Sequence, residues 1–219
     1  MSTPKTTTDL SILDCSATFR GVYTNPQLLQ SINLEKLTKS VLNEFRTYNI
    51  APTDITLENG DGLFSYSIKA HLFNRLITFT STAVNLEASF ARLIRGSDRK
   101  IGADCLRKIV AIGRDYLTDN CYFEIGVHAA FASETSRDAF FMQDNESHLQ
   151  LVGTLGYRKL ADSDQMVRLQ VDQSWVFPNA AYITWTTIGM KLTQLLEPET
   201  IWTPFFQMLE PLRLKLTDE

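Results

Sequence analysis

Residues 101–131 constrain the fold more than any other stretch, because two different periodicities meet there. In residues 101–117, apolar side chains recur every three or four positions, which predicts an amphipathic helix lying on an apolar surface. In residues 121–131, apolar side chains occupy alternate positions, which predicts a half-buried strand. Asp119 and Asn120 supply turn chemistry between the two. We therefore expect a long helix, a tight turn and a strand at the middle of the chain.

The elements before this joint and those after it follow a similar order. The first part is predicted as strand 16–24, helix 34–47, and strands 53–58, 63–73 and 76–92. The second part is predicted as strand 121–131, helix 135–143, strands 148–158, 165–173 and 180–188, and helix 199–216. The apolar phase slips between Ala83 and Val84, so a turn or bulge is expected there. Pro204 fits the first turn of the last helix, and Pro211 should kink it.

These elements predict an α+β fold, in which antiparallel strands are backed by two long amphipathic helices. We expect a flexible tail at 1–14 and two halves, 15–118 and 121–217, fused into one globular unit. The halves would repeat a βαβββ(β)α unit, through an internal duplication of layout rather than of sequence.

Laid edge to edge, the two halves resemble the duplicated half-domains of the TATA-binding-protein type, in layout only. The resemblance implies one curved sheet with helices on its convex side. DNA binding does not carry over, because the intercalating aromatic pairs have no counterpart here and the net charge is −4. The helix-grip lipid-binding type fits the final helix but leaves the mid-chain helix unexplained.

Composition narrows the classes of protein further. No apolar run approaches the ~18 residues of a membrane span, so no membrane association is expected. The three cysteines, Cys15, Cys105 and Cys121, are odd in number, and two of them fall on predicted buried faces. They favour reduced thiols and a cytoplasmic protein without disulfides. No motif for a metal or a cofactor is present, so neither is expected.

Polar strand faces supply the candidate pocket. His71 falls on the polar face of its strand, and His128 shares a strand face with Glu124, about 13 Å away along the strand. If the polar faces converge, the chain has one site formed by His71, Glu124, His128 and Arg168. The alternative is that these are ordinary solvent-facing strand residues.

Aromatic side chains supply the candidate partner contacts. Trp175 and Phe177 fall in or beside a predicted loop, where exposure would mark a contact site. Trp202, Phe205 and Phe206 form a stripe on the last helix that is either core or a docking surface. A local basic group comprises Arg92, Arg95, Arg99 and Lys100. It leaves nucleic-acid binding as a third, less favoured hypothesis.

The leading hypothesis for function is a non-enzymatic binding or assembly protein. It would contact another protein, or a second copy of itself, through its sheet surface or its C-terminal helix. The alternative is a small-molecule-binding protein or an enzyme, with a pocket between sheet and helix.

Overall fold

The structure is a computed structural model, and it describes most of the chain. The described residues are 7–24, 39–40, 42–48, 55–59, 66–72, 75–81, 85–141, 153–159, 166–188, 190–192 and 198–218. Its strands are β1 (Thr8–Tyr23), β2 (Ile55–Asn59), β3 (Tyr66–Leu72), β4 (Arg75–Ser81), β5 (Asn85–Phe90), β6 (Leu117–Phe131), β7 (Gly153–Lys159), β8 (Met166–Gln173), β9 (Ala180–Ile188), β10 (Met190–Lys191) and β11 (Leu214–Thr217). Its helices are α2 (Gly96–Gly113), α3 (Glu134–Phe141) and α4 (Pro198–Leu209), with short 3-10 turns η2 (Arg46–Tyr48) and η5 (Glu210–Leu212).

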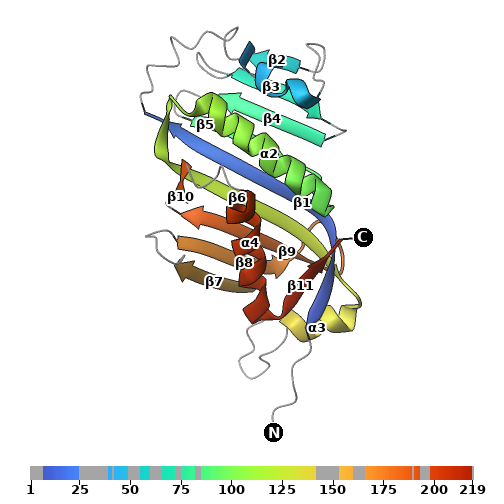
Figure 1. The fold of residues 1–219 in the computed structure, drawn as a ribbon. Helices are drawn as coiled ribbons and strands as arrows, with labels where there is room; N and C mark the ends of the chain where they lie inside the picture. Colours follow the sequence, from blue (N-terminus) through green and yellow to red (C-terminus); the bar gives the residue numbers. More distant parts are fainter. Residues whose placement is uncertain are drawn as a thin grey trace.

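These strands form one sheet, whose centre is the pair β1 and β6. The order across the sheet is β2-β3-β4-β5-β1-β6-β9-β8-β7, with β10 added to β6 and β11 added to β1. β1 and β6 run antiparallel, and their register extends from Leu10 opposite Phe131 to Tyr23 opposite Leu117. Figure 1 shows the two long strands crossing the middle of the molecule side by side. The described part is therefore a mixed fold of helices with a largely antiparallel sheet.

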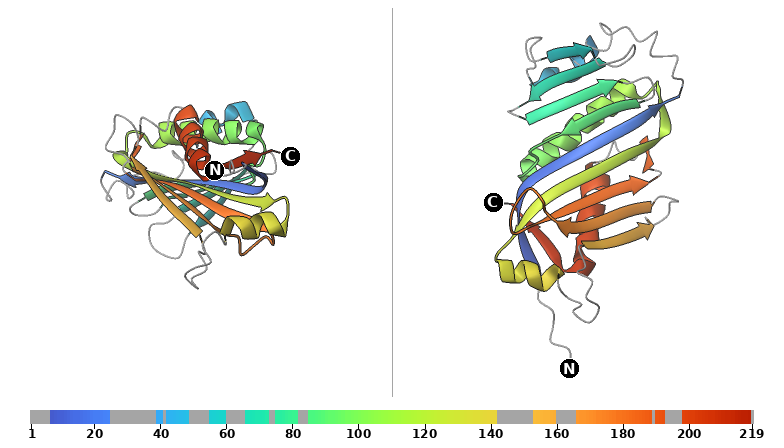
Figure 2. Two further views of the ribbon diagram at one scale, coloured as in Figure 1. Left: turned by 90° about the horizontal axis from the view of Figure 1, so that it is seen from below. Right: turned by 180° about the vertical axis from the view of Figure 1, so that it is seen from behind.

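Helices α2 and α4 lie on the same face of this sheet (Figures 1 and 2). The buried stripe of α2 includes Cys105, Leu106 and Ile109, spaced as the periodicity predicts. The strand side chains beneath the helices are fully buried, among them Phe19, Phe123 and Trp185. This layer is the main hydrophobic core, and at about 25 cal/mol per Å² of buried apolar surface it is the main source of stability.

The opposite face of the sheet carries the alternate side chains of each strand, which are mostly polar on β1. On β1 the side chains of Ser16 and Thr18 lie there, between the buried Cys15, Ala17 and Phe19. In the view from behind in Figure 2, no described helix crosses the middle of this surface. Within the described part of the chain, the sheet therefore has one face covered by helices and one face without a helical cover.

Several sequence predictions are confirmed by the described elements. The phase slip between Ala83 and Val84 predicts a turn or a bulge, and β4 pairs antiparallel with β5 across that point. The strand predicted at 180–188 is β9, with those bounds. Within the described residues, no helix is long and apolar enough to cross a membrane. Most of the predicted helix 34–47 lies outside the described residues, although 39–40 and 42–44 are helical.

The predicted tail at 1–14 is wrong in its second part. β1 begins at Thr8, and within the segment predicted as tail Leu10 and Ile12 are buried. The reason is a partner from the other end of the chain, because β11 pairs in parallel with Thr8–Ser11. Such a partner leaves no local trace in the sequence.

The predicted bounds of the mid-chain joint are also wrong. α2 begins at Gly96 and ends at Gly113, and β6 already begins at Leu117. Asp119 and Asn120 therefore lie within the strand rather than in a turn. A Cβ on Gly113 would lie 2.7 Å from Cδ1 of Leu117, so a larger residue there would require the Leu117 side chain to shift.

The final helix is shorter than predicted. α4 ends at Leu209, Pro211 lies in η5, and Arg213 takes a left-handed backbone with φ of 56°. Proline cannot donate the next helical hydrogen bond, and the left-handed residue turns the chain into β11. Pro204 lies inside α4 rather than in its first turn. With 12 residues against 18 in α2, α4 is the shorter backing helix.

The central pair predicts where a core substitution acts most strongly. Phe19 is 0% exposed and lies opposite Phe123. We expect Phe19→Ala to lower the free energy of unfolding by about 3–5 kcal/mol, through lost burial and the cavity left behind. Thr18→Ala, its neighbour on the other face, should cost about 1 kcal/mol or less. Urea unfolding of both variants measures this, and equal losses would contradict the assignment of the two faces.

Candidate functional site

The sheet face without helices is a continuous polar surface over the four strands β1, β6, β9 and β8. We call it the open face. Its residues are Asp14, Ser16, Thr18, Arg20, Tyr122, Glu124, Gly126, His128, Tyr182, Thr184, Thr186, Arg168, Gln170 and Asp172. The strand register aligns them in rows, one of which runs Asp14, His128, Tyr182, Asp172. A second row runs Thr18, Glu124, Thr186, Arg168.

His128 is held by ring contacts and a hydrogen bond on the open face. Its ring stacks on Tyr182 with centroids 4.4 Å apart and meets the edge of Phe177 at 5.2 Å. Its Nδ1 lies 3.0 Å from Oγ of Ser174. Burial is the largest effect on this group and lowers the pKa of His128, which Asp14 opposes. The neutral imidazole is therefore the form that this environment favours.

Ser174 uses its hydroxyl to close a turn. Its Oγ accepts the backbone N–H of Val176 at 3.2 Å and of Phe177 at 3.0 Å. With its oxygen taken by two donors, the hydroxyl hydrogen is directed to Nδ1 of His128. Ser174 is only 9% exposed. This is the geometry of a side chain that fixes a loop rather than of a nucleophile approached by substrate.

Glu124 is also held by its neighbours. It accepts a hydrogen bond from the Tyr122 hydroxyl and another from Oγ1 of Thr186 at 3.3 Å. Burial, and then the bond to Glu124, raise the pKa of Tyr122 to about 12. Arg168 lies opposite Thr186 in the register, so it is two strand spacings, about 10 Å, from Glu124. Within the described part of the chain, Nε of Arg168 is buried with no hydrogen-bond partner.

The predicted pocket of His71, Glu124, His128 and Arg168 is not formed. His71 belongs to β3, which β4, β5 and β1 separate from β6, a distance of about 19 Å. Its side chain lies outside the described part. The other three residues do share the open face, as the alternation predicts. Periodicity identifies the face of a side chain, but it carries no information on the order of strands.

The loop between β8 and β9 carries the most exposed aromatic residue of the described chain. Trp175 is 93% exposed and Val176 is 68% exposed, whereas Phe177 packs on His128. Asn179 anchors the other end of the loop, in a left-handed conformation with φ of 58° that asparagine tolerates. Its Nδ2 donates to the carbonyl of Phe131 at 2.9 Å, and its own carbonyl accepts from the Phe131 N–H at 2.9 Å. A nearly free tryptophan therefore stands on a fixed loop.

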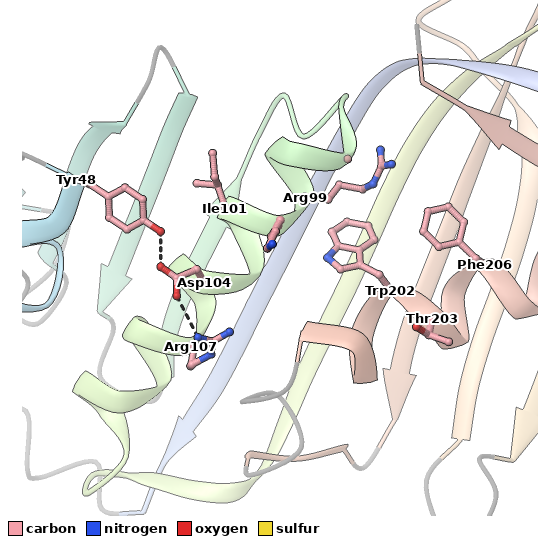
Figure 3. Close-up of a pocket in the computed structure, with 10 residues that line it drawn as sticks. Tyr48, Arg99, Ile101, Asp104, Arg107, Trp202, Thr203 and Phe206 are labelled. Carbon is pink, nitrogen blue, oxygen red and sulfur yellow. Dashed lines mark hydrogen bonds and ion pairs between the residues drawn. The ribbon is translucent and has the colours of Figure 1, made fainter.

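The predicted aromatic stripe on the last helix divides between core and surface. Phe205 is 1% exposed, so its prediction as a partner contact is wrong; it belongs to the core beneath α4. Trp202 and Phe206 are half-buried and line a pocket of about 890 Å³ between α2 and α4 (Figure 3). Arg99 and Lys100 of the predicted basic group reach the same pocket.

Sequence reasoning missed the remaining walls of this pocket. Tyr48 arrives from η2, and its hydroxyl bonds Asp104 of α2. Arg107 holds the same carboxylate at 3.2 Å. The only available signal was the position of Asp104 and Arg107, three apart on one helix. Nothing local indicated that Tyr48 would meet them. Within the described residues, no three His, Cys, Asp or Glu side chains gather as a metal site would require.

Comparison with known proteins adds no assignment. No protein-family model matches the chain, and no curated protein is detectably similar to it.

The histidine environment predicts a pH dependence. Because the folded pKa of His128 lies below its ordinary value of 6.5, the unfolded chain binds a proton there that the folded chain does not. The free energy of unfolding should therefore fall as the pH drops through about 6.5. We expect the decline to be shallower in His128→Gln, which cannot titrate. Urea unfolding of both proteins at several pH values between neutral and mildly acidic measures the difference. Parallel curves would show that His128 does not contribute.

Proposed function

We propose that this is a non-enzymatic binding protein that holds another protein against the open face and the loop from Ser174 to Asn179. The observation that carries the proposal is Trp175, 93% exposed on a loop fixed at both ends. Tryptophan is among the residues that contribute most to binding at protein interfaces. A loop that is already ordered loses little conformational entropy when it binds. Such a loop is suited to anchoring a partner.

The charge of the open face supports a partner other than a second copy. Arg20 and Glu87 neutralise one another through an ion pair of 2.9 Å. The remaining ionised groups in the rows are Asp14, Glu124, Asp172 and Arg168, an acidic excess. A symmetric dimer would place the same acidic patch against itself, which costs free energy. A partner with basic and hydrogen-bonding side chains is complementary.

The absence of coupled chemistry on this face supports binding rather than catalysis. Glu124 and His128 are four residues apart on one strand, about 13 Å, so they do not share a reacting atom. Each is already engaged, Glu124 by Tyr122 and Thr186, and His128 by Ser174. These hydrogen bonds hold the side chains of Glu124 and His128 in place, which favours a binding surface of fixed shape.

We also propose that the chain consists of two similarly built parts, 15–118 and 121–217, that arose by internal duplication. The strand order supports it: β5, β4, β3 and β2 extend from one side of the central pair, and β9, β8 and β7 extend from the other. In each part a long strand is followed by a meander and then by a backing helix. An internal duplication would give both parts this layout.

We also propose a cytoplasmic location. The thiols of Cys15, Cys105 and Cys121 are all buried and form no disulfide, which is the usual state of thiols in a reducing compartment.

The loop predicts a specific loss of binding. Trp175→Ala should leave the fold intact, because the side chain is almost entirely in solvent. It should reduce recovery of the partner by about tenfold or more, as truncation of an interface anchor does. Quantitative pull-down from native extract, comparing wild type with Trp175→Ala, measures this.

Arg114→Ala is the matched control, since Arg114 is exposed at the C-terminal end of α2 and is not part of the open face or of the loop. It should retain the partner. Sizing of the purified protein separates a second copy from a different protein. If no protein is recovered in a manner that depends on Trp175, the proposed interface is wrong.

A further inference from the structure

The pocket between α2 and α4 lies on the helical side of the sheet, away from the open face. We propose that it binds a small organic anion, a carboxylate or similar group carried on a flat apolar body. This site is separate from the proposed protein contact and does not depend on it. Its volume of about 890 Å³ is within the range of ~300–1,000 Å³ typical of small-molecule sites.

Aromatic and aliphatic side chains form the walls of the pocket. Trp202 and Phe206 come from α4, Ile101 from α2, and Tyr48 from η2 (Figure 3). Trp202 also borders a small void on the core side, together with Leu106 and Phe123. Its ring therefore stands between the pocket and the core. Phe205 meets that ring edge-on, with centroids 6.3 Å apart, and fixes its position.

Two of the cations in the pocket already have acidic partners from the chain itself. Arg99 binds Asp218 at 2.8 Å and donates to the carbonyl of Ile94 at 2.6 Å, while its guanidinium lies over Phe206. Arg107 binds Asp104 at 3.2 Å. The first turn of α2 is engaged too, because the Gly96 N–H donates to Asp218 at 2.9 Å. These groups shape the pocket and leave their charge largely balanced.

In the described part of the pocket, the ammonium group of Lys100 and the indole N–H of Trp202 are uncommitted. Lys100 is exposed, and none of the ion pairs found among the described residues includes it. The indole Nε1 of Trp202 is buried and has no acceptor within the described part. Figure 3 shows that nitrogen on the edge of the ring that faces α2. A buried N–H without an acceptor carries a penalty of ~1–3 kcal/mol, which a ligand oxygen would remove.

The apolar walls, together with Lys100 and the indole N–H of Trp202, favour a ligand that has an apolar body and an anionic end. An apolar body can cover Trp202, Phe206 and Ile101. An anionic oxygen at the end of this apolar body can accept a hydrogen bond from Nε1 of Trp202 and form an ion pair with Lys100 of α2. A neutral molecule of the same shape would use only the apolar walls. A fully ionic molecule would leave those walls in contact with water.

Two dyes that differ only in charge test the proposal. Anilinonaphthalene sulfonate carries an anionic group on an aromatic body, and phenylnaphthylamine is the same body without that group. We expect the full-length protein to bind one equivalent of the sulfonate. Lys100→Ala and Trp202→Phe should each weaken the sulfonate by about tenfold, because each removes a charge-assisted contact. Binding of the neutral dye should be unchanged in Lys100→Ala.

Arg114→Ala is the matched control. Arg114 is an exposed cation that follows the last turn of α2, about 21 Å along the helix from Lys100. Its loss should leave both dyes unaffected. Urea unfolding confirms that each variant is folded before titration. The proposal is overturned if the sulfonate does not bind, if Lys100→Ala leaves its affinity unchanged, or if Lys100→Ala weakens both dyes equally. None of these results bears on the dependence of protein binding on Trp175.

Discussion

The pairing of β1 with β6 is the contact on which the rest of the structure depends. These strands of 16 and 15 residues come from the two parts of the chain and share an almost continuous register. Each then pairs on its outer side with the first strand of a meander, which runs from β5 to β2 beside β1 and from β9 to β7 beside β6. Because both strands alternate over most of their length, one set of side chains, including Phe19 and Ile125, joins the core under the helices. The other set, including Thr18 and Glu124, forms the open face.

This division of faces determines where a ligand or partner can bind. The helical side is filled by core residues such as Trp185 and Phe205, and the larger pocket lies there between the helices, where Trp202 and Lys100 line it. The other side presents hydrogen-bonded polar rows, with one exposed aromatic residue at the end. Two chemically different surfaces therefore lie on opposite sides of one sheet. On the first we propose a small organic anion, and on the second a protein with basic side chains.

The sequence predicts those features that depend on local spacing. Alternation placed Glu124 and His128 on one face of β6, and the phase slip near Ala83 marked the reversal between β4 and β5. Local spacing does not predict features that depend on contact with a segment far away in the chain. The start of β1, from Thr8 to Ser11, pairs with β11, and the separation of His71 from β6 depends on strand order. The pocket needs Tyr48 to reach α2, which no periodicity encodes.

The claim that β1 and β6 unite the chain into one cooperative unit is tested most directly by native-state hydrogen exchange. We expect the backbone amides of both strands to be among the slowest to exchange, and those of β5 and β9 beside them to open with the same free energy as global unfolding. Two separate opening free energies, one shared by β1 and β5 and another by β6 and β9, would contradict this. The two parts would then be independent units that only touch.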